Sequence, residues 1–147
     1  MKTMKFIIRN ALEKDLPSIL KLFEKKGEYP LSSPGKEKRE LFSAMLSNSS
    51  RYIFVGEKND TVSAFVSMRI EPRFENLLKF SAFITDIKAD GDSANILTAV
   101  LSRATAVAME NGCSEVIISD KNVNPQSRSV YSICGFCESN TFFTKRL

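Results

Sequence analysis

The sequence predicts one α/β (α+β) domain in which a central, mixed and mostly antiparallel sheet is flanked by helices. Three observations lead to this prediction. The spacing of apolar residues switches repeatedly between the helical and the strand period. The 147 residues, 43% of them hydrophobic, can fill one core. No repeat or linker-like tract divides the chain, so we expect a single domain over residues 1–147, with the order β-α-α-β-β-β-α-β-α-β.

The first elements are a short strand at 6–9 and a helix that begins near Asp15. An acidic cap followed by Pro17 in the first turn is typical of a helix start, and apolar residues then recur at helical spacing. Gly27 is expected to end this helix. A turn-rich segment separates it from a second helix at 36–46.

From Arg51 onward the apolar period changes to two, which favours strands, and an Asn59-Asp60 turn indicates a hairpin. A helical period returns later and ends at Asn111-Gly112, before a short apolar run that resembles a buried strand. The pattern predicts strands at 52–57, 62–70 and 77–89, a long helix at 96–108, a strand at 116–118, a short helix at 126–133 and a final strand at 141–144. The β-α-β crossover should be right-handed.

Composition excludes several kinds of site. The chain has no His, so a Ser-His-Asp triad and His-based zinc sites are ruled out, and a general base must be a carboxylate, a water or a tyrosinate. Cys134 and Cys137 form a C-x-x-C pair, but Cys113 is the only further thiol, too few ligands for zinc. We therefore expect free thiols and no metal.

Charge and the amino-terminal segment bear on partners and location. A net charge of +4 suits an anionic ligand, but basic residues are interspersed with acids and form no stripe, which argues against nucleic-acid binding. The apolar stretch Phe6-Ile7-Ile8 is too short for a signal peptide or a membrane span. We expect a cytoplasmic protein with no membrane partner.

The most specific motif is the run at 124–136, which reads NPQSRSVYSICGF. It resembles the Asn-x-x-Ala-x-x-x-Tyr-x-x-x-Gly-Phe signature of the GNAT acetyltransferases, with Ser127 in the small-residue place. The opening from Ile8-Arg9 to Pro17 is also similar to the family's, and the element order agrees over the whole chain. The resemblance implies the GNAT acyl-CoA N-acyltransferase fold, with acetyl-CoA as co-substrate and a small-molecule or peptide amine as acceptor, attacking the thioester directly. A homodimer stays open.

The resemblance also implies roles for residues of this motif. Tyr131 would protonate the departing CoA thiolate, which a phenol with a pKa near 10 can do. Asn124 would help to hold the pantetheine arm, with Ser127 beside it, since Ser127 and Tyr131 share a face if this segment is helical. The alternative is that Tyr131 and Phe136 simply pack the helix against the sheet.

A base for the acceptor amine is predicted on the third strand. Asp86 is the best-placed carboxylate, although the closest register to the family's glutamate falls on Thr85, and adjacent strand residues face opposite sides. An exposed aspartate without a catalytic role is the alternative, and Glu71 and Glu75 are weaker candidates. The backbone edge at Ile87, Lys88 and Ala89 is expected to bind the cofactor.

The phosphate-binding loop of the family departs most from its pattern here. The family usually carries Arg/Gln-x-x-Gly-x-Gly/Ala, where this chain has Asp92-Ser93-Ala94-Asn95-Ile96-Leu97. By this alignment Asn95, Ile96 and Leu97 are predicted to lie at the cofactor. Asn95 tolerates positive φ and could replace a glycine, whereas Leu97 adds bulk where the backbone should approach the phosphate. A helix N-terminus favours an anion by about 0.3 to 1 kcal/mol. The repulsion between a phosphate and the carboxylates of Asp90 and Asp92 can exceed that gain.

Two functions follow from this loop. Either acetyl-CoA binds through the strand edge with displaced phosphates, and the chain is an N-acetyltransferase, or the chain is a noncatalytic GNAT-like binding module. The intact spacing from Asn124 to Tyr131 favours the enzyme.

Overall fold

The computed structural model describes residues 5–24, 35–120, 123–139 and 143–147. These residues form a five-stranded sheet in the order β1-β2-β3-β4-β5. The strands are β1 (Phe6–Asn10), β2 (Arg51–Lys58), β3 (Thr61–Arg73), β4 (Asn76–Ala89) and β5 (Cys113–Ile118). The first four pair antiparallel and β5 runs parallel to β4, so the predicted mixed, mostly antiparallel sheet is confirmed.

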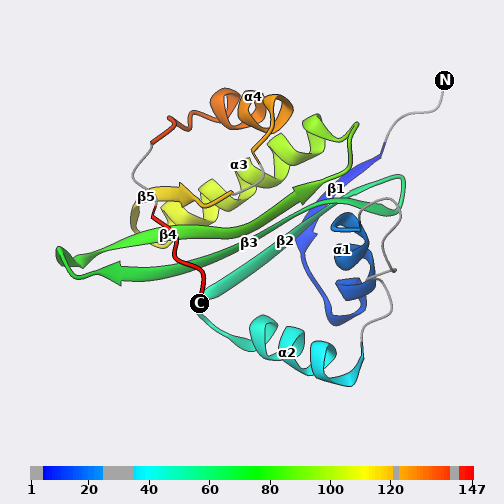
Figure 1. Ribbon diagram of the computed structural model, residues 1–147, viewed down its shortest axis with the longest axis horizontal. Coiled ribbons are helices and arrows are strands. Elements are labelled where there is room, and N and C mark those ends of the chain that lie inside the picture. The colour runs from blue at the N-terminus through cyan, green and yellow to red at the C-terminus, as the bar shows by residue number, and fades with distance from the viewer. Residues whose placement is uncertain (1–4, 25–34, 121–122, 140–142) are drawn as a thin grey trace.

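Helices cover both faces of the sheet (Figure 1). On one face lie α1 (Leu16–Leu22), which follows the 3-10 turn η1 (Glu13–Asp15), and α2 (Lys36–Ser47). On the other face lie α3 (Ala94–Glu110) and α4 (Pro125–Ile133). In the described part of the chain, no helix is both long and apolar enough to cross a membrane.

The final strand predicted at 141–144 is not found in the described part of that segment. Phe143 and Thr144 lie outside any strand, and residues 141 and 142 are outside the described residues, as is Gly27. Phe143 is 96% exposed, so its side chain gains none of the burial against neighbours that favours aromatic residues in strands.

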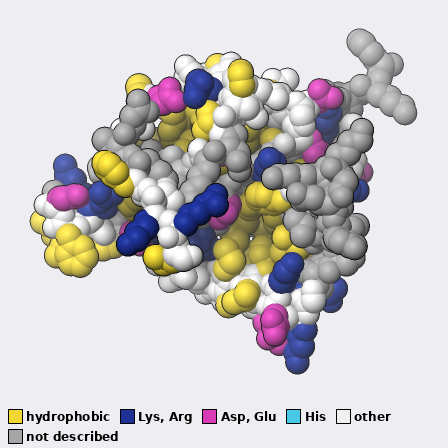
Figure 2. Space-filling model, in the orientation of Figure 1, with side chains coloured by type: hydrophobic (Ala, Val, Ile, Leu, Met, Phe, Trp, Pro, Cys, Tyr) yellow, Lys and Arg dark blue, Asp and Glu magenta, His cyan; other side chains and the backbone are white. Residues whose placement is uncertain are grey.

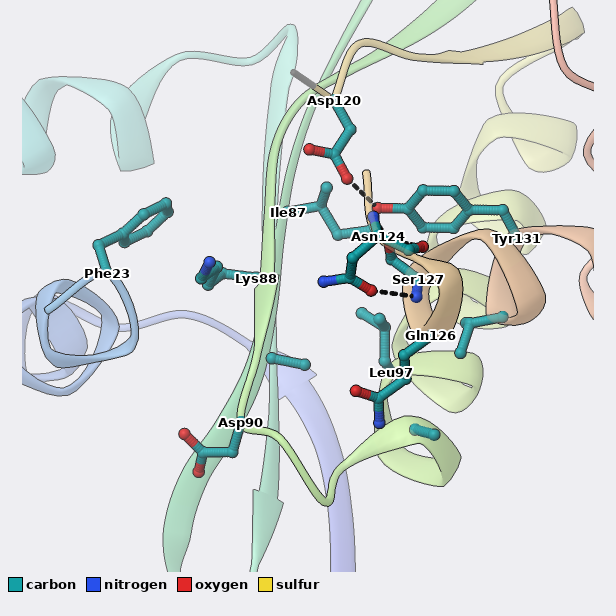
Figure 3. A pocket seen from close by; sticks show the side chains of 13 residues that line it. Phe23, Ile87, Lys88, Asp90, Leu97, Asp120, Asn124, Gln126, Ser127 and Tyr131 are labelled. Atoms are coloured by element: carbon teal, nitrogen blue, oxygen red, sulfur yellow. Dashed lines mark hydrogen bonds between the residues drawn. The ribbon is translucent and has the colours of Figure 1, made fainter. Parts of the chain in front are cut away.

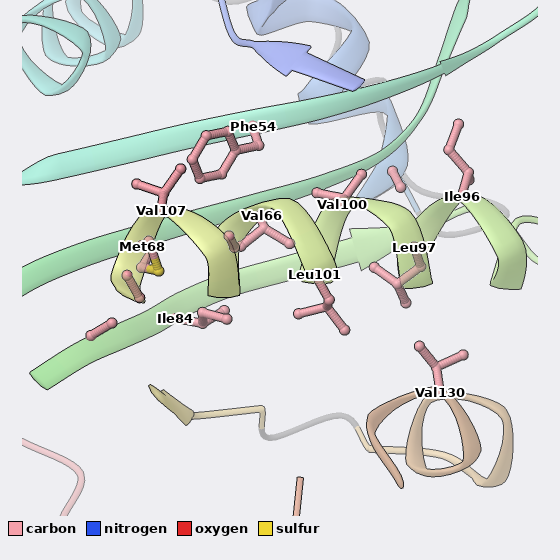
Figure 4. Close-up of a cluster of buried hydrophobic side chains, with 14 residues drawn as sticks. Phe54, Val66, Met68, Ile84, Ile96, Leu97, Val100, Leu101, Val107 and Val130 are labelled. Carbon is pink, nitrogen blue, oxygen red and sulfur yellow. The ribbon is translucent and has the colours of Figure 1, made fainter. Parts of the chain in front are cut away.

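The main core lies between α3 and the sheet (Figure 4). Val100 and Leu101 of α3 are fully buried, in one cluster with sheet residues that include Phe54 and Val66. Gly56 allows α3 to approach this closely, since a Cβ there would lie 2.7 Å from Ile96 Cγ1 and 2.8 Å from Val100 Cγ2. Val130 of α4 joins the cluster and fixes α4 beside α3.

The opposite face is anchored by the charged pair of the opening motif. Arg9 donates to Asp15 through both terminal nitrogens, at 2.7 and 2.8 Å, and to Glu57 at 2.7 Å. Asp15 also accepts from the Leu12 N–H at 2.7 Å. Burial alone would raise the pKa of Asp15, but the hydrogen bonds from Arg9 and Leu12 outweigh it and lower that pKa below its ordinary value. The pair therefore ties the start of α1 to β1 and β2.

The β3–β4 hairpin extends beyond the rest of the sheet (Figure 1). Its end carries exposed apolar side chains beside basic ones (Figure 2), among them Phe74 at 95% and Leu78 at 92% exposure. Arg73 lies 5.3 Å from the centre of the Phe83 ring and pairs with Glu75 at 3.3 Å. The side chains of Phe74 and Leu78 are thus in contact with solvent in the described part of the chain.

The parallel strands β4 and β5 separate halfway along β4. Their pairing ends at Ile84 and Ile118, and the Ser119 N–H still donates to the Ile84 carbonyl at 3.1 Å. β4 continues to Ala89 and keeps its pairing with β3 on the other side. Its outer edge from Thr85 onward has no strand neighbour among the described residues. The separation leaves an opening beside the end of β4.

Candidate active site

A cavity of about 110 Å³ occupies this opening (Figure 3). Its walls come from the end of β4, the first turn of α3, α4, and Asp120, which lies just after β5. The sequence-predicted residues that line it are Ile87, Lys88, Ala89, Leu97, Asn124, Ser127 and Tyr131. Asp86, Asn95 and Ile96 do not line it. Most of the predicted set therefore converges on one cavity.

Asn124 and Ser127 form the N-terminal cap of α4. Asn124 Oδ1 accepts from the Ser127 N–H at 2.8 Å, and Ser127 Oγ accepts from the Asn124 N–H at 2.9 Å. This reciprocal pairing is a capping box, and Pro125 at the first helical position supports it. The Asn124 amide nitrogen points toward β4 across the cavity (Figure 3). The motif's asparagine thus orients α4 and still offers a donor to the cavity.

Tyr131 donates its hydroxyl proton to Asp120 Oδ2 at 2.6 Å (Figure 3). Burial raises the pKa of Tyr131, and the hydrogen bond to and negative charge of Asp120 raise it further, outweighing the opposite effect of Ser127. The phenol therefore keeps its proton at neutral pH. The ring also contacts Phe136 edge to face, with centroids 6.4 Å apart. Tyr131 therefore has both features: it packs against Phe136, as the alternative interpretation of the sequence expected, and it lines the cavity.

Asp120 is a cavity residue that the sequence interpretation missed. It lies just beyond the carboxyl end of β5, at the point where parallel strands separate and sites are commonly built. An acidic residue two positions after the predicted strand at 116–118 was the available signal. Its relation to Tyr131 depends on how α4 returns past β5, which local pattern does not reveal.

The structure does not bring Asp86 into the cavity with Tyr131. A β-bulge between Ser67 and Met68 in the β3–β4 register sets Asp86 opposite Ser67 and leaves Thr85 as the extra residue. Asp86 is exposed and accepts from the Thr85 hydroxyl at 3.0 Å, while Arg51 donates to Thr85 at 3.2 Å. Strict alternation of side chains between the two faces, on which the choice between Thr85 and Asp86 depended, does not hold at a bulge.

The start of α3 also differs from what its sequence suggested. Asn95 is part of the helix and has no positive φ, so it does not replace a glycine in a loop. Ile96 is buried in the core with 1% exposure, which turns its side chain away from the cavity. Leu97 does line the cavity, and its bulk forms part of the apolar wall.

The loop before α3 is joined to α4. Gln126 Nε2 donates to the Gly91 carbonyl at 2.6 Å, and Asp90 in the same loop lines the cavity. The acidic charge predicted at the α3 entrance therefore lies at the cavity rim. Among the described residues, no group of three or more His, Cys, Asp or Glu side chains could hold a metal ion.

The parallel strands β4 and β5 separate beside the capped helix α4, and Tyr131 lines the opening. This arrangement agrees with the acyltransferase fold that the resemblance of the 124–136 motif implies. Comparison of the sequence with protein-family models and with curated proteins finds no match. Comparison with solved structures finds close similarity.

A candidate acetyltransferase from Agrobacterium tumefaciens is 25% identical, with a TM-score of 0.82, over 96% of this chain and 99% of that one. The glucosamine-6-phosphate N-acetyltransferase of Arabidopsis thaliana is 19% identical, with a TM-score of 0.77, over 97% and 98%. A transcriptional regulator from Bacillus halodurans is 16% identical, with a TM-score of 0.82, over 97% and 100%. The chain has the GNAT acetyltransferase fold, as its sequence predicted.

Proposed function

We propose that this protein is an acetyl-CoA-dependent N-acetyltransferase and that the cavity between β4 and α4 receives the thioester. The observation that carries the proposal is the Tyr131 hydroxyl in a cavity beside a strand edge that has no strand neighbour among the described residues, in a fold shared with acetyltransferases. When bound, the cofactor supplies an acetyl group activated as a thioester.

The residues present fit the pantetheine end of the cofactor. The edge of β4 at Ile87, Lys88 and Ala89, which has no strand neighbour in the described part of the chain, can pair with an extended, amide-containing arm, as a sheet edge pairs with a peptide. The amide nitrogen of Asn124 is a further donor, and Leu97 adds apolar surface. In this proposal these groups bind and orient the arm.

The residues near α3 fit the pyrophosphate less well. Asp90 lines the cavity, and Asp92 follows in the same loop, so both carboxylates would repel phosphate oxygens. Asn95 is exposed but does not line the cavity, and Ile96 is buried in the core. We therefore place the phosphates away from Asp90 and Asp92, displaced from the position usual for the family.

Tyr131 holds the proton that the leaving sulfur requires. Its pKa is raised, so the phenol is protonated throughout the neutral range and a proton is present for the leaving sulfur, although the raised pKa also makes the phenol a weaker acid. Asp86 remains a candidate base, but because it is exposed and outside the cavity it would act through a water molecule.

The acceptor is proposed to be a primary amine of a small molecule or a peptide. The Arabidopsis relative acts, by its name, on glucosamine 6-phosphate, which makes this amine a reasonable first member of a panel. The experiment is a thermal-shift titration with acetyl-CoA, followed by turnover assays over the panel. A ligand at 100 times its Kd adds about 2.7 kcal/mol to the stability of the folded state. An unchanged melting temperature at millimolar acetyl-CoA would refute the proposal.

One observation favours a noncatalytic binding module as the second candidate. The Gln126–Gly91 hydrogen bond closes the gap between α4 and the loop before α3, and Asp90 adds negative charge beside it. A module of this kind would bind no acetyl-CoA in the titration above.

A further inference from the structure

We propose that Asp120 is a second catalytic residue of this site, which accepts the proton lost by the acceptor amine and controls the release of the Tyr131 proton to sulfur. The inference rests on the proposed function. It begins from two side chains on one cavity wall, Asp120 after β5 and Tyr131 on α4, whose oxygens lie 2.6 Å apart.

Asp120 meets the positional requirement for a base that Asp86 does not. Asp120 lines the same cavity as Tyr131, whereas Asp86 is exposed outside it. The cavity is also lined by Phe23 and Lys88, so it is reached by residues from the α1 side as well as from α4. An acceptor amine in this cavity would therefore lie near both the carboxylate and the phenol.

Packing alone does not call for a carboxylate at this position. A half-buried phenol needs one acceptor, and a neutral oxygen would satisfy it at a smaller desolvation cost than a partly buried carboxylate. The carboxylate does what a neutral acceptor cannot, because it can take up a proton and then donate one.

The two groups can move protons with a complete balance. In the resting pair the Tyr131 hydroxyl donates to the ionised Asp120. As the amine nitrogen bonds to the acetyl carbon, one N–H proton passes to Asp120. Protonated Asp120 then donates a hydrogen bond to the Tyr131 oxygen. The phenol proton is thereby free to transfer to the sulfur as the C–S bond breaks. Asp120 finally returns its proton to the phenolate, so both residues regain their starting states.

This order makes release of the thiol depend on prior loss of the amine proton. While Asp120 is ionised, it holds the phenol proton away from sulfur. The other charged groups on the cavity wall are Lys88 and Asp90, and the Ser127 hydroxyl also lies near the phenol. Lys88 and Asp90 are common to all the variants below, so they do not alter the comparison.

The test compares Asp120→Asn with Asp60→Asn, which removes the same charge from the exposed β2–β3 turn, where Asp60 has a positive φ that asparagine also adopts. We expect Asp120→Asn to lower turnover of the best amine in the panel more than tenfold, with an acetyl-CoA Kd within threefold of wild type. Asp60→Asn should match wild type in both. Asp120→Glu, which keeps a carboxylate, should recover part of the lost turnover.

A second readout isolates the hydrogen bond itself. Absorbance of tyrosinate near 295 nm, followed against pH and referenced to Tyr131→Phe, reports the ionisation of Tyr131. Asp120→Asn should move this ionisation to lower pH, because the charge and the accepting oxygen that raise the pKa of Tyr131 are removed. Full turnover in Asp120→Asn would overturn the inference even with this shift. Absence of acetyl-CoA binding by the wild type would instead refute the proposed function, on which the inference depends.

Discussion

The side-chain amide of Gln126 donates to the backbone carbonyl of Gly91 at 2.6 Å and so joins the first turn of α4 to the loop that leads into α3. This contact spans the space between the two helices that border the cavity. The contact therefore lies at the edge of the cavity proposed for acetyl-CoA.

We expect acetyl-CoA to break the Gln126–Gly91 hydrogen bond when it binds, so Gln126→Ala should strengthen its binding. A hydrogen bond of this kind contributes about 1 kcal/mol net, so its removal before binding should lower the Kd about fivefold. Isothermal titration calorimetry measures the change, with Arg128→Ala, an exposed residue of the same helix, as the control. A weaker affinity in Gln126→Ala would mean that Gln126 is itself a cofactor ligand.

Tyr131→Phe should lower turnover more than tenfold, because the variant lacks the proton for the leaving thiolate. Its free energy of unfolding should fall by about 1.5 to 3 kcal/mol, since the ring and its contact with Phe136 remain and the one hydrogen bond lost is to a charged acceptor. Steady-state kinetics and urea unfolding give the two values. Turnover equal to wild type would remove Tyr131 from the mechanism.

Asp15→Asn should destabilise the fold by roughly 3 kcal/mol, because it leaves the Arg9 guanidinium without its bidentate partner. Glu40→Gln breaks only the exposed contact with Lys36, 3.8 Å long, and should change stability by less than about 0.5 kcal/mol. Urea unfolding compares the two. Equal losses would show that the buried pair is not an anchor of the opening motif.

The same carboxylate gives a pH dependence of stability. The pKa of Asp15 is lower in the folded than in the unfolded chain, so its contribution is complete above the ordinary value of 3.8 and is lost as the pH falls below that value through the lowered folded pKa. The free energy of unfolding, measured over this acid range, should fall more steeply with decreasing pH for wild type than for Asp15→Asn. Parallel curves would contradict the assignment.

Gly56→Ala should destabilise the protein by about 1 to 3 kcal/mol, because the added Cβ would lie 2.7 Å from Ile96 and 2.8 Å from Val100 in the packed core. Gly91→Ala is the matched control, since a Cβ there meets nothing within 4 Å. Thermal unfolding of both variants measures the difference. A Gly56→Ala protein as stable as wild type would show that α3 can move away from β2.

Much of the fold could be predicted because local patterns determine it. The 124–136 motif predicted α4, and its Asn124 and Ser127 proved to be a capping box, an arrangement of short range. The long apolar helix and the hairpin strands were also confirmed. These features depend on residues only a few positions apart.

The remaining features depend on contacts between distant segments. The bulge at Thr85 and Asp86 arises from pairing with β3 and cannot be read from alternation in β4 alone. The pairing of Asp120 with Tyr131 depends on the return of α4 past the end of β5. The final strand predicted at 141–144 is not found in its described residues, where no described segment covers the 96% exposed side chain of Phe143.

The central claim is that acetyl-CoA occupies the opening between β4 and α4, and amide NMR tests it most directly. On titration with acetyl-CoA, we predict shifts of the backbone signals of Ile87, Lys88, Ala89 and Ser127, which line the cavity, while those of α2 stay unchanged. Saturable shifts confined to these cavity residues are the expected result. No shift at millimolar acetyl-CoA, or shifts confined to α2, would contradict the claim.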